Sequence, residues 1–303
     1  MLISSLKPKL ISLVFALFAT AIGAQTTNTI QPIKTEMMNE QKMKIEIWSD
    51  VMCPFCYIGK RHLEQALAQF DDSNRVEIVW KSYQLNPDLP LKIENKESAY
   101  EYLAKAKGIS YEQSVQMHDN VVKMAAKVGL NYQFDKAVVA NSFYAHQLAQ
   151  YAKEKGLGVE IEELLFKAYF TEGKDISDKA TLVLLGAELG FTEAEVEQAL
   201  SDEKYATIVR KDIAEAQQIG VRGVPFFVFD RKYAVSGAQP TEQFLGALQQ
   251  SVSEWKTANN INGIQIKEGD GQRARPKVFV NKRSDLSLFY ASPIDCLSEG
   301  QSA

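Results

Sequence analysis

The alternation of apolar and polar residues predicts a strand, a helix and a second strand at the start of the folded region. Residues 44–49, KIEIWS, alternate with a period of two, which is typical of a half-buried strand. From Pro54 to Phe70 apolar residues recur every three to four positions, which predicts a helix with proline at its first position. Residues 75–85, RVEIVWKSYQL, predict a further strand. This order favours two parallel strands joined by a helix that crosses one face of their sheet.

The chain from residue 97 to about 220 has helical periodicity throughout. Capping boxes that begin at Ser110 and Thr192, and glycines after several periodic runs, indicate where helices start and stop. The pattern predicts helices over 110–129, 135–156, 159–173, 177–190 and 192–220. Strand character then returns in VPFFVFD, 224–230, and KYAVSG, 232–237, and a last helix is predicted from Pro240 to Trp255.

These elements predict an α/β fold, in which helices flank a mixed sheet and a large all-helical segment is inserted between its strands. We place the folded domain at 43–256 and the insertion at 97–205. The tail at 257–303 is expected to be mostly irregular, although RPKVFV at 275–280 has the pattern of a short strand.

The first 24 residues have a different character. Two lysines precede an apolar run from Leu10 to Ala24 that ends in small residues, which is the order of a secretory signal peptide. The run is too short to favour a lasting membrane span. We therefore expect cleavage after the signal peptide at 1–24, a flexible leader at 25–42 and a periplasmic location. The alternatives are an uncleaved anchor, or a cytoplasmic product whose translation starts at Met37, Met38 or Met43.

The amino-acid composition excludes some classes of protein. A chain of 303 residues with 46% hydrophobic residues can bury a sizeable core without a disulfide scaffold. Its net charge of -4 is spread over both signs, which argues against a nucleic-acid-binding protein with a basic face. The chain has only three cysteines, so two of them in the short sequence CPFC require an explanation.

Cys53 and Cys56 lie where the first predicted helix begins. Exposed N–H groups and the positive end of the helix dipole favour a thiolate there. An exposed Cys53 could attack a disulfide, and a deeper, shielded Cys56 could resolve the mixed disulfide. We predict no metal site, because zinc needs two more ligands and the remaining Cys and His residues form no second close pair. An inert bridge is also disfavoured, since so short a loop gives little stabilisation.

Three motifs resemble the DsbA family of thioredoxin-fold thiol–disulfide oxidoreductases, and most closely its FrnE-like branch. They are SDVMCPFCYIGKRHLE at 49–64, ANSFYAHQLAQYA at 140–152 and GVRGVPFFVFDRKYAVSGAQPTEQF at 220–244. The resemblance covers about residues 43–256. It implies a thioredoxin fold with a helical insertion. It also implies disulfide exchange with protein thiols or disulfides, with no cofactor other than the redox-active Cys53–Cys56 disulfide.

The resemblance also assigns roles to individual residues. Cys53 would be the attacking thiol, Cys56 the resolving thiol, and Pro225 a cis-proline that faces the pair. Substrate contacts would come from a group of residues around the pair and the groove, namely Pro54, Phe55, Asn141, His146 and Val224. For His146, a role in helix packing is the alternative.

The chain departs from its relatives in three ways. Thioredoxin and DsbA place a buried acid six residues before the first cysteine, where this chain has Ile47, and the nearest carboxylate is Asp50. Some FrnE-type proteins carry a second cysteine pair near the C-terminus, but this tail has only Cys296, which we interpret as a stray thiol. Kappa-class glutathione transferases and hydroxychromene-carboxylate isomerases have serine at the Cys53 position, so a cysteine there argues against their chemistry.

We therefore predict a protein disulfide oxidoreductase or isomerase that acts on protein thiols and disulfides with an unidentified redox partner. Two alternatives remain. A glutathione-linked transferase or isomerase would form a glutathione adduct without dithiol turnover. A non-enzymatic, chaperone-like binding module would keep its activity in a Cys53→Ser variant.

Overall fold

The strands form one mixed sheet in the computed structural model, which describes residues 41–259 and 276–280. The strands of these residues are β1 (Met43–Ser49), β2 (Val76–Ser82), β3 (Phe226–Phe229), β4 (Tyr233–Ser236) and β5 (Lys277–Val280). Their order in the sheet is β2-β1-β3-β4-β5. As predicted, β1 and β2 run parallel, whereas β3 is antiparallel to both β1 and β4. The predicted strand in 275–280 is present as β5, which pairs with β4 in parallel.

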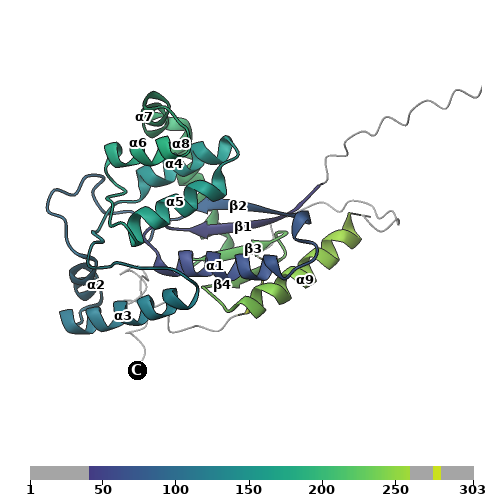
Figure 1. The fold of residues 1–303 in the computed structure, drawn as a ribbon. Coiled ribbons are helices and arrows are strands. Elements are labelled where there is room, and N and C mark those ends of the chain that lie inside the picture. The colour runs from purple at the N-terminus through teal and green to yellow at the C-terminus, as the bar shows by residue number, and fades with distance from the viewer. Residues whose placement is uncertain (1–40, 260–275, 281–303) are drawn as a thin grey trace, which may run out of the picture. The chain divides into compact units, whose positions relative to one another are not determined.

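The helices of the described residues lie between these strands in the chain. They are α1 (Pro54–Ala68), the 3-10 helix η1 (Ser73–Arg75), α2 (Ala99–Lys107), α3 (Tyr111–Lys127), α4 (Phe143–Glu154), α5 (Gly158–Phe170), α6 (Lys179–Glu188), α7 (Glu193–Ser201), α8 (Glu203–Ile219) and α9 (Thr241–Ala258). Helices α2 to α8 all lie between β2 and β3 in the chain, as the helical insertion requires. Figure 1 shows α4 to α8 grouped at one end of β1 and β2, while α1 and α9 pack together beside the sheet.

The alternation along β1 directs its side chains to two cores. Ile45 and Ile47 join the larger core with Phe227 and Phe229, under α1 and α9. Trp48 lies on the other face of the sheet, in a smaller core that includes Val228 and Ala216 of α8. Both faces of the central strands are therefore covered, and alternate residues belong to opposite layers.

Two predicted helices differ from those observed. The helix predicted over 135–156 begins only at Phe143, because residues 137–139 pair instead with the start of α2. The Val139 N–H donates to the Glu97 carbonyl at 3.0 Å and the Ala99 N–H to the Ala137 carbonyl at 3.3 Å. The helix predicted over 192–220 is divided into α7 and α8 at Asp202, whose carboxylate caps α8 by accepting from Lys204 N at 2.8 Å.

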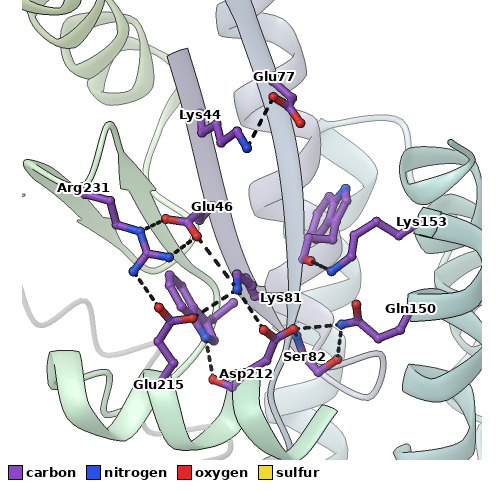
Figure 2. Close-up of polar contacts among 12 residues, drawn as sticks. Lys44, Glu46, Glu77, Lys81, Ser82, Gln150, Lys153, Asp212, Glu215 and Arg231 are labelled. Carbon is purple, nitrogen blue, oxygen red and sulfur yellow. Dashed lines mark hydrogen bonds and ion pairs between the residues drawn. The ribbon is translucent and has the colours of Figure 1, made fainter. Parts of the chain in front are cut away.

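A polar network fastens β1, β2 and the β3–β4 turn to α8 (Figure 2). Arg231, in the turn, forms ion pairs with Glu46 of β1 and Glu215 of α8. Lys81 of β2 donates to Asp212 of α8 at 2.9 Å. The buried Asp212 carboxylate also accepts from the Ser82 N–H and the Gln150 amide, at 3.1 and 2.8 Å. These contacts join the turn after β3 to β1 and α8, and β3 itself, which follows Pro225, pairs with β1.

Several predictions concern residues outside the described part of the chain. These are the signal peptide at 1–24, nearly all of the leader at 25–42, Cys296 and most of the tail. They remain predictions. Among the helices that the structure describes, none combines the length and apolar character needed to cross a membrane.

Candidate active site

The two cysteines occupy the start of α1, directly after the turn that ends β1. Cys53 is the N-cap residue, with extended backbone angles, and Pro54 takes the first helical position. The Cys53 N–H donates to the Asp50 carbonyl at 2.9 Å, and the Cys56 N–H to the Cys53 carbonyl at 3.0 Å. Both cysteines are free thiols. Cys53 therefore stands at the N-terminus of α1, where the positive end of the helix dipole lies.

The segment before β3 meets the cysteine pair from the neighbouring strand. Trp48 pairs with Phe226, which brings residues 224 and 225 beside the end of β1. The Val224–Pro225 peptide bond is cis, as the resemblance implied. The Cys53 thiol donates to the Val224 carbonyl at 3.4 Å. A Cβ atom on Gly59 of α1 would lie 3.1 Å from Pro225 Cγ, so the glycine permits this close approach of helix and proline.

Both thiols are shielded in this structure. Cys56 is fully buried, as expected, but Cys53 is only 2% exposed, whereas the sequence analysis predicted an exposed attacking thiol. The reason is that the Cys53 side chain turns inward to the Val224 carbonyl and that Met52, Pro54 and Phe55 around it are also buried. Contacts of Pro54 and Phe55 with a substrate remain predictions, and such contacts require this region to open.

The environment of Cys56 keeps that thiol protonated. Burial raises the pKa of Cys56 well above its ordinary value, and the adjoining Cys53 thiol raises it further. The Ser49 hydroxyl and the Asp50 backbone, which also hydrogen-bond to the Cys56 sulfur, oppose this effect without cancelling it. Cys56 thus rests as a neutral thiol and must lose a proton before it can attack a disulfide.

Tyr132 supports the cysteine loop, although nothing in the sequence analysis selected it. Its buried hydroxyl donates to the Pro54 carbonyl at 2.7 Å, between residues 78 positions apart in the chain. Burial raises the pKa of Tyr132, with the charges of Cys53, Tyr57 and Cys56 in the same direction. The tyrosine therefore stays a hydrogen-bond donor that holds the first turn of α1 in place.

Asn141 lies before α4, so it does not share a helix with His146 as the sequence analysis assumed. Its amide donates to the Leu89 carbonyl at 2.5 Å, and its oxygen accepts from Gln84 Nε2 at 3.0 Å and Phe143 N at 2.8 Å. The side chain is buried and joins the β2–α2 connection to the start of α4. Its role in substrate binding remains a prediction.

His146 is buried beneath the cysteine turn. Its Nε2 lies 3.6 Å from Asp50 Oδ1, and both side chains are 1% exposed. Asp50 also accepts from the Met52 N–H at 3.2 Å and the Leu85 N–H at 2.7 Å. A buried carboxylate is therefore present close to the pair, in the turn and not at the strand position that Ile47 occupies. Contact of His146 with substrate remains a prediction.

A cluster of charged side chains lies at the next turn of α1. Glu163 of α5 accepts from the Tyr57 hydroxyl and from Lys60 Nζ, each at 2.5 Å, and pairs with Arg61. Burial would raise the pKa of Glu163, but these donors outweigh it and lower the pKa to about 2. The group ties α1 to α5. Within residues 41–259 and 276–280, no three Cys, His, Asp or Glu side chains converge as a metal site would require.

Comparison with known proteins identifies the family. Residues 44–249 match the family model of the DSBA-like thioredoxin domain, and the chain belongs to this family. It is 36% identical to the probable DsbA oxidoreductase SCO1869 from Streptomyces coelicolor, whose crystal structure superposes with a TM-score of 0.68 and covers 75% of this chain and 94% of that chain. It is also 28% identical to the uncharacterized protein YwbO of Bacillus subtilis strain 168, over 61% of this chain and 85% of YwbO.

The fold is shared with enzymes of another reaction class. A 2-hydroxychromene-2-carboxylate isomerase is 14% identical, with a TM-score of 0.51, and covers 72% of this chain and 99% of that chain. At this identity the likeness shows the fold alone. The function must therefore be argued from the residues of the site.

Proposed function

We propose that the chain exchanges disulfides with protein substrates through Cys53 and Cys56. One observation carries this proposal: two free thiols lie together at a helix N-terminus, one beside the Val224–Pro225 segment and the other fully buried. Family membership supports thiol–disulfide oxidoreductase activity in general. The FrnE-like branch and the direction of electron flow are part of the proposal.

The proposed reaction needs no external cofactor, because the cysteine pair itself carries the two electrons. A Cys53 thiolate attacks a substrate disulfide, one substrate sulfur leaves as a thiolate, and a mixed disulfide forms. Cys56 then loses its proton and attacks the Cys53 sulfur. The Cys53–Cys56 bond forms as the bond to substrate breaks, so the pair is oxidised and the substrate reduced. The reverse sequence oxidises a substrate dithiol.

The test uses single variants in a Cys296→Ser background, so that no third thiol contributes. Cys53→Ser should abolish reduction of insulin and oxidation of a reduced model protein. Cys56→Ala should accumulate a mixed disulfide that mass spectrometry places on Cys53. A mixed disulfide that accumulates on Cys56 in the Cys53→Ser variant would reverse the assigned roles, and full activity of that variant would favour the binding-module alternative.

A small thiol such as glutathione is a second candidate substrate. The 2% exposure of Cys53 favours it, because a small molecule needs less opening of the site than a folded protein does. A stable glutathione adduct on Cys53 without turnover of protein disulfides would support this alternative.

Export and a redox partner complete the proposal. A protein that donates disulfides needs an oxidising compartment to persist in its oxidised form. A mature N-terminus near residue 25 in a periplasmic fraction is the expected result. A cytoplasmic product that starts at Met37, Met38 or Met43 would contradict it.

A further inference from the structure

Three buried acidic or basic side chains lie in one region beneath the cysteine turn. They are Asp50 from the turn, His146 from α4 and Glu162 from α5, with exposed fractions of 1%, 1% and 4%. We call them the buried cluster. Asp50 and His146 are in contact at 3.6 Å, and the charges of both act on Glu162. Burying three titratable groups in one dry region costs folding free energy. Such groups are therefore found most often at functional sites.

The cluster is also incompletely hydrogen-bonded. Within the described residues, neither ring nitrogen of His146 has a hydrogen bond of normal length, and Oε2 of Glu162 has none. Buried polar atoms in native proteins nearly always have partners. The Asp212 network on the other face of the sheet shows how this chain satisfies a buried carboxylate that has a purely structural role. In the buried cluster, by contrast, His146 and Glu162 have polar atoms without such hydrogen-bond partners.

Asp50 connects the cluster to the resolving thiol. Its backbone hydrogen-bonds to the Cys56 sulfur, while its carboxylate faces His146. The strand position at which relatives carry a buried acid holds Ile47, an apolar side chain in the main core. Within the described residues, the carboxylate next to the cysteine turn is thus that of Asp50, which belongs to the cluster.

We propose that the buried cluster takes up the proton that leaves Cys56 when this thiol attacks the mixed disulfide. This inference rests on the proposed function. The Cys56 S–H bond breaks and the cluster gains the proton, so the net charge of the dry region is unchanged. The Cys56 thiolate then forms the bond to Cys53, the Cys53–substrate bond breaks, and the substrate sulfur leaves with the electron pair. The cluster returns its proton to the departing thiolate or to water.

The charge balance around the cluster suits proton uptake near neutral pH. Burial raises the pKa of Glu162 to about 7, although His146, Lys153 of α4 and Lys60 of α1 oppose this increase. Burial lowers the pKa of His146, but Asp50 and the charge of Glu162 outweigh it and raise the pKa above the ordinary value. A group that titrates near the working pH can both accept and release a proton.

The experiment separates the two thiol reactions. Reduced protein in the Cys296→Ser background is mixed with 5,5′-dithiobis(2-nitrobenzoate), and release of the yellow thiolate is followed from pH 5.5 to 8.5. The first release reports attack by Cys53, and the second reports resolution by Cys56. In the unsubstituted site the second rate should show an inflection near pH 7. His146→Gln and Glu162→Gln should each slow the second release about tenfold at pH 7, a loss equivalent to one pKa unit, and remove the inflection.

The first release should keep its rate in both variants, and a cooperative urea unfolding transition should show that they are folded. His118→Gln, which alters a buried histidine of α3, is the matched control and should leave both releases unchanged. No inflection in the unsubstituted site, or a second release in both variants within twofold of it, would overturn the inference. Absence of two releases in the unsubstituted site would instead refute the proposed function itself.

Discussion

The Cys53 thiol and the Val224 carbonyl meet at 3.4 Å, although 171 positions separate them in the chain. This contact joins the first turn of α1 to the segment before β3. While Cys53 is a thiol, it occupies the Val224 carbonyl as a donor. When Cys53 becomes a thiolate or forms a mixed disulfide, it can no longer donate, and the carbonyl becomes available to the backbone N–H of an extended substrate.

Cys53 and Cys56 should therefore differ in reactivity. We predict that iodoacetamide labels Cys56 at least about tenfold more slowly than Cys53 at pH 8, because burial raises the pKa of Cys56 and reduces its thiolate fraction. In the Cys296→Ser background, Cys53→Ser should lose nearly all early labelling and Cys56→Ser almost none. Peptide mapping of partly labelled protein measures this, and early label on Cys56 would contradict it.

Gly59 should control how closely α1 approaches Pro225. An alanine Cβ there would lie 3.1 Å from both Pro225 Cγ and Phe227 Cζ, so two packed rings would have to move. We predict that Gly59→Ala lowers the free energy of unfolding by about 1 kcal/mol, because overpacking outweighs the better helix propensity. Gly158→Ala, whose new Cβ would come no closer than 3.3 Å to Lys153, should cause a smaller loss in urea denaturation.

Substitution of Asp212 should lower the free energy of unfolding more than substitution of most other polar residues. Removal of its carboxylate takes the acceptor from the buried Ser82 N–H. It also takes one of two acceptors from Lys81 and from the Gln150 amide, which donate to Glu215 and the Ser82 hydroxyl as well. We predict that Asp212→Ala lowers the free energy of unfolding by about 3 kcal/mol. The matched control is Glu77→Ala, which removes the exposed pair with Lys44 at 3.9 Å and should cost less than about 0.5 kcal/mol. Figure 2 shows both sites. Equal losses in urea titrations would contradict the prediction.

Local patterns predicted much of this site. Cys53 at the start of a helix, Pro54 at its first position and the strand after Pro225 follow from short stretches of sequence, because propensity and capping act within a few residues. The alternation along β1 also predicted which side chains share a face. The order of the elements and the resemblance then defined the fold class.

The features of the site that local patterns did not predict depend on tertiary contacts. Tyr132 contacts Pro54 across 78 positions, and Glu162 is brought near Asp50 only by the packing of α5. No periodicity in the sequence identifies such partners. The helix start at Phe143 was missed for a similar reason: the helical period extends back to residue 135, but the backbone of the distant 97–99 segment supplies residues 137–139 with other hydrogen-bond partners.

Glu163 should make stability depend on pH in the acidic range. Its folded-state pKa of about 2 lies below the ordinary value of 4.5, so its contribution is complete above about pH 4.5 and is lost as the pH falls toward 2. The carboxylate is 35% exposed, which limits the effect through solvent screening. We predict that Glu163→Gln lowers the free energy of unfolding by about 1 kcal/mol at pH 7 and that the difference disappears near pH 2.

Urea denaturation at pH 7, 4 and 2.5 measures this dependence. Glu197→Gln, on the exposed face of α7, serves as the control and should match the unsubstituted protein at each pH. If the loss in Glu163→Gln were the same at pH 2.5 as at pH 7, its origin would be packing and not the charge. The bonds from Tyr57, Lys60 and Arg61 would then not depend on an ionised carboxylate.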